Sequence, residues 1–90
     1  MTTYKKDPDA TLDYEFDWSA WLLGVSDTIA SVAWLLTGTL VKVSSSFTSL
    51  TATAFVSGGT VGEDETLTCR ITTTGGRIDD RSVTLKITPR

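Results

Sequence analysis

Two runs in the last third of the chain alternate apolar and polar residues. The apolar positions recur at every second residue, and they are Leu67, Cys69, Ile71, Val83, Leu85 and Ile87. The pair Gly75-Gly76 separates the runs. A period of two gives each strand one buried and one wet face, so the pattern predicts an antiparallel β-hairpin packed on a core. The polar positions are mainly Thr, Arg and Lys, which indicates a structural or binding role for this hairpin.

The segment 12–18 alternates in the same way. Its apolar positions are Leu12, Tyr14, Phe16 and Trp18, and its acidic positions are Asp13, Glu15 and Asp17. We therefore expect a strand with an aromatic-rich buried face. The acidic row is predicted to be solvated and to resist edge-to-edge aggregation. Neighbouring carboxylates on a strand project side by side and do not wrap a calcium ion as a loop does.

Residues 27–36 predict a further strand. Ala30, Val32, Trp34 and Leu36 fall on one face, and we expect Trp34 to be the centre of the core. A helix is the competing interpretation because Ala and Leu are frequent there. Segment 19–24 predicts either one helical turn, capped by Ser19 and ended by Gly24, or a wide connection.

The middle of the chain predicts short strands joined by turns. The remaining expected elements are a strand at 40–44, a turn or bend at 44–49, a strand at 51–56 and a surface loop at 57–65. About six to seven short strands at regular spacing predict an all-β fold, an immunoglobulin-like antiparallel β-sandwich. The 90 residues are enough for one domain, which we assign to 11–90.

Residues 1–10 predict an extended N-terminal arm. They are polar, and Pro8 restricts its neighbour and lacks an amide donor. The arm either becomes ordered on a partner or is a frayed terminus.

Charge and hydropathy disfavour two classes of partner. The formal net charge is −3 and no basic stripe is present, so nucleic-acid binding is not expected. The most apolar stretch, 18–36, is interrupted by Gly24, Ser26 and Asp27, so no membrane span is expected. The N-terminus lacks the apolar core of a signal peptide, and a single cysteine cannot form an internal disulfide. We therefore expect a soluble protein made in a reducing cytoplasm, with Cys69 buried.

Few residues suggest chemistry. The chain has no histidine, the commonest general base and metal ligand. The hydroxyls of Ser44–Ser46 have no base to activate them, and Gly58–Gly62 lacks the Lys-Ser/Thr of a phosphate loop. Arg77 and Arg81 flank Asp79-Asp80, which predicts local ion pairs that fix a turn. We expect no enzyme activity, no cofactor and no metal site.

The order and spacing of several short motifs carry a family resemblance. The motifs are Lys6–Trp18, Asp27–Trp34, Ser57–Thr60, Cys69–Arg77 and Asp79–Ser82. Together they resemble a family of small tailed-bacteriophage virion proteins described as fiber-tail adaptor proteins, which is similar to immunoglobulin-like β-sandwiches. The resemblance implies a structural adaptor that is assembled in the bacterial host cytoplasm and bridges neck or tail components and tail fibres. The implied partners are portal, connector, tail or fibre proteins, with several copies forming a ring or array in the virion tail or neck.

The expected contact elements are the N-terminal arm and the segment 18–23, because both are extended or irregular and aromatic residues often anchor interfaces. The candidate interface residues are Tyr4, Lys5, Lys6, Pro8, Trp21 and Leu22. Two alternatives are a capsid decoration (cement) protein with the same fold and a carbohydrate-binding module. A sugar site would use exposed aromatics on a sheet face, whereas Tyr14, Phe16 and Trp18 are predicted to face the core.

Overall fold

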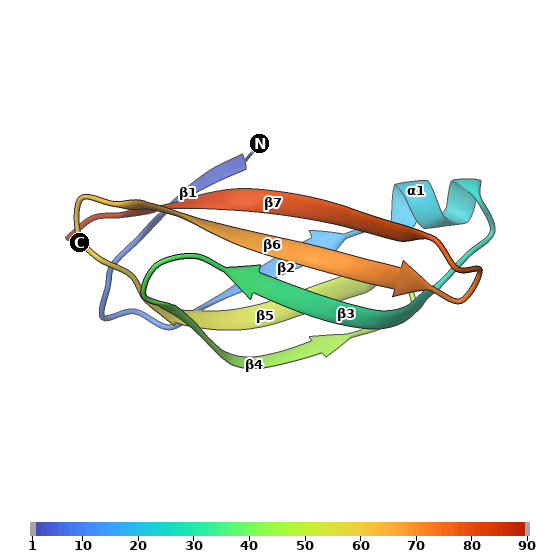
Figure 1. Ribbon diagram of the computed structural model, residues 1–90, viewed down its shortest axis with the longest axis horizontal. Coiled ribbons are helices and arrows are strands. Elements are labelled where there is room, and N and C mark those ends of the chain that lie inside the picture. Colours follow the sequence, from blue (N-terminus) through green and yellow to red (C-terminus); the bar gives the residue numbers. More distant parts are fainter. Residues whose placement is uncertain (1, 90) are drawn as a thin grey trace.

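The computed structural model describes residues 2–89, which form seven strands and one short helix. The elements are, in order, β1 (Thr2–Lys6), β2 (Leu12–Asp17), α1 (Ser19–Gly24), β3 (Ile29–Leu36), β4 (Leu40–Phe47), β5 (Thr51–Gly58), β6 (Asp64–Thr73) and β7 (Ile78–Ile87). They build a four-stranded sheet, β1-β7-β6-β3, and a three-stranded sheet, β2-β5-β4 (Figure 1). The prediction of an all-β sandwich is confirmed. The orders β2-β5-β4 and β3-β6-β7 match those of corresponding immunoglobulin strands, although an immunoglobulin-like classification stays a prediction.

The core lies between the sheets and follows the period-two pattern. The six apolar side chains that the alternation assigned to the hairpin β6–β7 are all buried, which confirms that prediction, including the burial of Cys69. In the opposite sheet, Phe16 pairs with Ala52 and Tyr14 pairs with Ala54. All four side chains are buried, and the small alanines leave room beside the aromatic rings.

Trp18 is the fully buried tryptophan, whereas Trp34 is only half-buried, so the prediction that Trp34 is the centre of the core is wrong. Trp34 lies on β3, the outer strand of its sheet, where it contacts Phe16 with ring centroids 5.7 Å apart. Ala30 is exposed because the register of β3 shifts between Ile29 and Ser31. The bulge takes Ala30 out of the alternating face to which the pattern had assigned it.

Strand β4 is longer than predicted. The turn expected at 44–49 begins only at Thr48, because the serines 44–46 pair with β5 after a register shift between Lys42 and Ser44. Thr48 closes the turn: its amide donates to Thr51 O over 2.8 Å, and its hydroxyl contacts the Thr51 hydroxyl at 2.8 Å. An outer strand with both faces wet tolerates serine, so the polar composition concealed a strand.

Residues 2–6 are ordered within the chain itself. They form β1, which runs parallel to β7 with Thr2 opposite Val83 and Lys6 opposite Ile87. The Lys6 side chain is fully buried, and its Nζ donates to Gly58 O over 2.7 Å and to Asp7 O over 2.9 Å. Neither a frayed end nor ordering only by a partner describes these residues. These residues form an edge strand of the sandwich, and the division of the chain into an arm, 1–10, and a domain, 11–90, stays a prediction.

Candidate functional site

One end of the sandwich is built from three segments that are distant in the sequence. We call it the α1 end, and it comprises residues 18–28, 48–50 and 73–77. Backbone hydrogen bonds connect the segments: Trp18 N donates to Leu50 O, and Thr74 N donates to Thr28 O, each over 3.0 Å. The α1 end is therefore a cross-linked platform and not a set of independent loops.

Helix α1 presents different faces to the core and to solvent. Leu22 is fully buried, while the next residue, Leu23, is 67% exposed. Successive residues of a helix point about 100° apart, which explains the contrast. Trp21 is half-buried, and its ring centroid lies 5.9 Å from that of Trp18. The helical turn is thus the correct one of the two interpretations of this segment.

The predicted cap of α1 is wrong. Ser19 is the first residue of the helix, Trp18 occupies the capping position, and no side chain caps the helix. The Ser19 amide donates instead to Asp17 Oδ1 over 2.9 Å. A hydrogen bond from the Ser19 hydroxyl, and then this bond from the Ser19 amide, hold the pKa of Asp17 below its usual value.

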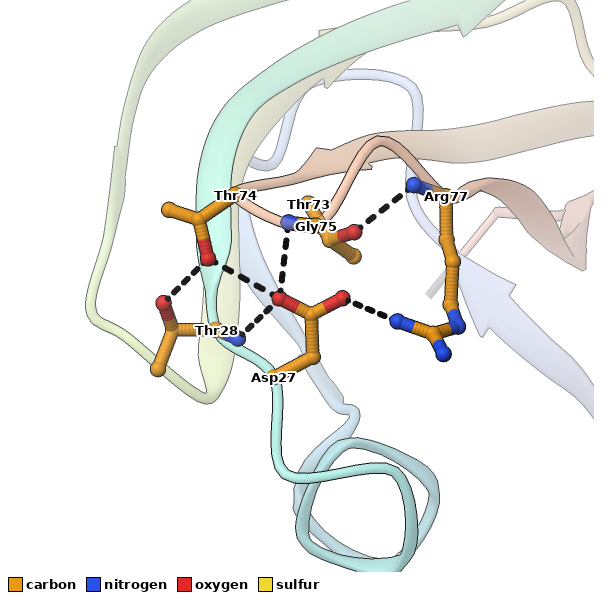
Figure 2. A network of polar contacts seen from close by, with 6 residues as sticks. All are labelled: Asp27, Thr28, Thr73, Thr74, Gly75 and Arg77. Carbon is orange, nitrogen blue, oxygen red and sulfur yellow. Dashed lines mark hydrogen bonds and ion pairs between the residues drawn. The ribbon is translucent and has the colours of Figure 1, made fainter.

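A buried carboxylate fixes the α1 end (Figure 2). Asp27 Oδ1 accepts hydrogen bonds from the Thr28 amide at 2.9 Å, the Thr74 hydroxyl at 2.9 Å and the Gly75 amide at 3.0 Å. Asp27 Oδ2 pairs with Arg77 Nη1 at 2.9 Å. The Asp27 side chain is only 4% exposed, so one carboxylate joins the start of β3 to the β6–β7 turn.

The hydrogen bonds to Asp27 hold its pKa well below the usual range. The largest contribution is a hydrogen bond from the Thr73 hydroxyl, and the Thr28 amide, the Thr74 hydroxyl and the Gly75 amide add to it against the opposing effect of burial. A carboxylate with several donors is stabilised in its charged form. The native network therefore requires an ionised Asp27.

The arginines near this turn do not form the predicted local ion pairs with Asp79-Asp80. Arg77 pairs with Asp27, and Asp80 pairs across the hairpin with Arg70 at 2.8 Å. Arg81 donates from Nη1 to Asp17 O over 2.8 Å, and its Cζ lies 4.2 Å from the centre of the Trp18 ring. Alternation along β7 turns Asp80 and Arg81 to opposite faces, which prevents both from joining one local cluster.

We expect Asp27→Asn to lower the melting temperature by several degrees at neutral pH, because the amide loses the Arg77 ion pair and presents hydrogens to donors. Since the native pKa of Asp27 lies below the ordinary 3.8, its contribution is complete above that value and is lost as the pH falls below it. Thermal unfolding of both proteins from neutral to acidic pH measures this. A difference that stays constant below pH 3.8 would contradict the assignment.

The candidate residues of the N-terminal segment lie on a second surface, which we call the β1 edge and define as Thr2–Lys6 with Pro8. Tyr4 is 43% exposed, and its ring lies 5.4 Å from that of Tyr14. Lys5 is exposed and lies opposite the exposed Lys86, whereas Pro8 is half-buried. Lys6 alone of this group is fully buried.

The structure thus distributes the six candidate residues between two surfaces and the interior. Tyr4, Lys5 and Pro8 are on the β1 edge, and Trp21 is at the α1 end, while Lys6 and Leu22 support the fold. Sequence reasoning included Leu23 in the contact segment 18–23 but did not name it as a candidate residue. The helical interpretation contained the signal, because burial of Leu22 turns its neighbour outward.

The described residues offer little reactive chemistry. Among residues 2–89 no three His, Cys, Asp or Glu side chains are placed to hold a metal ion. Burial raises the pKa of the Cys69 thiol to about 11, which keeps it protonated and inert at neutral pH. No helix in the described part of the chain is long and apolar enough to cross a membrane.

Comparison with known proteins agrees with this geometry. The model of a family described as podophage GP4 fiber-tail adaptor protein gp77 matches residues 6–86. No curated protein matches the sequence. Because the match spans nearly the whole chain, the chain belongs to this family of phage tail adaptors, and the resemblance found in its motifs is confirmed. Membership supports a structural role in the virion tail.

Proposed function

We propose that this member of the fiber-tail adaptor family bridges neck or tail components of the virion to tail fibres through the α1 end and the β1 edge. The observation that carries the proposal is that helix α1 exposes Leu23 and leaves Trp21 half-buried, on a platform fixed by Asp27. Rigid aromatic and aliphatic anchors contribute most to protein interfaces, since little ordering entropy is lost when they bind.

The β1 edge is the second contact surface. Lys5 and Lys86 lie side by side on the outer face of the four-stranded sheet, so they would complement an acidic surface on a partner. The partners are portal, connector, tail or fibre proteins, and several copies of the chain assemble on each particle inside the host cell. The family match supports the tail adaptor role on which these details depend.

The test compares Leu23→Asp with Val61→Asp in virions. Both side chains are largely exposed, at 67% and 51%, so neither substitution should unfold the protein. Val61 belongs to the β5–β6 loop, outside the α1 end, and serves as the control. We expect Leu23→Asp to lower the amount of adaptor or of attached fibre per purified particle at least about tenfold, as the loss of an interface anchor should.

Particle composition by quantitative mass spectrometry and fibre counts by electron microscopy measure the effect. Wild-type amounts of both for Leu23→Asp would contradict a contact at the α1 end. Deleting residues 1–9 is a poorer test, because it removes strand β1 and uncovers β7, so lost incorporation would also follow from misfolding.

A further inference from the structure

Strand β3 forms an unprotected edge of the four-stranded sheet. It runs for eight residues, Ile29–Leu36, with no charged residue and no proline. Its side away from β6, which we call the β3 edge, pairs with no other strand of residues 2–89. In Figure 1 it ends its sheet beside β4. A long uncharged edge is a template for pairing with another chain.

The other outer strands carry the protection that β3 lacks. Strand β1 holds two lysines, β2 presents a row of three carboxylates, and β4 has Lys42 and a bulge within the strand, whereas the bulge of β3 lies at its start, before Ser31. Pairing two copies through β1 or β2 would bring like charges together, and the bulge interrupts β4. Two β3 edges meet without any charge repulsion. We infer that β3 binds a second copy of this chain, β3 against β3, as an antiparallel pair about a two-fold axis.

The backbone sets the register of this pair. The Thr37 amide donates towards β6, to Thr66 O over 3.2 Å. The amide and carbonyl groups of successive residues in an antiparallel strand point to opposite neighbouring strands. Since those of Thr37 point to β6, those of Leu36, Trp34 and Val32 point to the β3 edge. A two-fold axis at Ala33 places Val32 opposite Trp34 of the second copy. Both residues then offer an amide and a carbonyl to each other, as a hydrogen-bonded pair requires.

The same register matches the side chains. Val32 and Trp34 are both half-buried on the inner face, and an aromatic residue opposite a β-branched one is a favourable cross-strand pair. On the outer face, Leu35, which is 41% exposed, lies opposite the small Ser31 of the second copy. The axis repeats each contact twice. Pairing therefore covers the apolar side chains that β3 leaves partly exposed.

Disulfide trapping tests the register. Ala33 is a non-hydrogen-bonded position on the β3 edge, where opposite Cβ atoms lie close enough to form a disulfide. We expect Ala33→Cys to form a disulfide-linked dimer under mild oxidation. Thr3→Cys, exposed on the outer face of β1, is the control, and the buried Cys69 is common to both proteins. Equal cross-linking of the two variants, or none, overturns the register.

Measuring dimer formation without cross-linking tests whether the β3 edge is the contact between the two copies. Ala33→Glu places the new carboxylate opposite Arg70 within its own sheet, which is compatible with folding, but sets two carboxylates together at the axis. We expect sedimentation to show a wild-type dimer, unchanged by Thr3→Glu, and a dissociation constant raised more than about tenfold by Ala33→Glu. A wild type that stays monomeric at high concentration, or an unaffected Ala33→Glu dimer, overturns the inference. A monomer would leave the edge to a strand of another protein.

Discussion

Replacing Trp18 with alanine is expected to lower the free energy of unfolding by about 3–5 kcal/mol, close to the whole stability of a domain of this size. Trp18 is fully buried, contacts the tilted ring of Trp21 and is covered by the Arg81 guanidinium. Alanine would leave a cavity at the base of α1 and remove the ring beneath Arg81. Urea unfolding followed by far-ultraviolet circular dichroism measures the loss.

Two comparisons make this prediction specific. Trp18→Phe keeps an aromatic ring beneath Arg81, so it should lower the free energy of unfolding by less than half as much as Trp18→Ala. Trp34→Ala should also cost less, because Trp34 is half-buried on an outer strand. A larger loss for Trp34→Ala than for Trp18→Ala would place the centre of the core at Trp34 after all.

Lys6→Ala is expected to lower the free energy of unfolding by about 2–4 kcal/mol, from lost apolar contact of the side-chain stem and from the loss of hydrogen bonds to two part-buried carbonyls. The carbonyls belong to Asp7 and Gly58. The exposed neighbour Lys5→Ala should change stability by less than about 0.5 kcal/mol. Denaturant titration of both variants measures the difference, and equal small effects would show that the Lys6 amine is not needed.

The variant Lys6→Met distinguishes the contribution of the Lys6 amine to stability from that of the aliphatic stem. Methionine keeps most of the buried volume and avoids burying a charge, so the cost should fall to about 1–2 kcal/mol. Burial lowers the pKa of Lys6 from the usual 10.5, and an unfolded chain therefore keeps this proton to a higher pH. The wild type should gain stability relative to Lys6→Met as the pH rises towards 10.5. A stability difference between the two proteins that narrows as the pH rises would contradict a lowered pKa of Lys6.

The local sequence pattern was sufficient to predict the buried faces where the strands that pack against each other both alternate with a period of two. The alternation in β2 and the β6–β7 hairpin correctly predicted which faces are buried, because each strand packs one face against the other sheet. It failed where position within a sheet decides exposure. Nothing near Trp34 indicates that β3 is an outer strand, and nothing near Ser44–Ser46 indicates that β5 pairs with them.

The contacts of the candidate site were harder to predict because their partners are distant in sequence. Asp27 bonds with Thr74, Gly75 and Arg77, which are 47 to 50 positions away. The lysines of β1 suggested a solvated arm, yet Lys6 is buried against a carbonyl 52 positions away. Trp21 was proposed as an aromatic residue in an irregular segment, and the fold also exposes Leu23 of the same helix.

The pairing of β1 with β7 has a consequence for synthesis of the protein. Thr2 lies opposite Val83, so β1 can take its place only after β7 has left the ribosome. Contacts between such distant residues close the largest loops and are the slowest to form. A growing chain that has not yet released β7 therefore lacks the β1 edge, with Lys5 set beside Lys86.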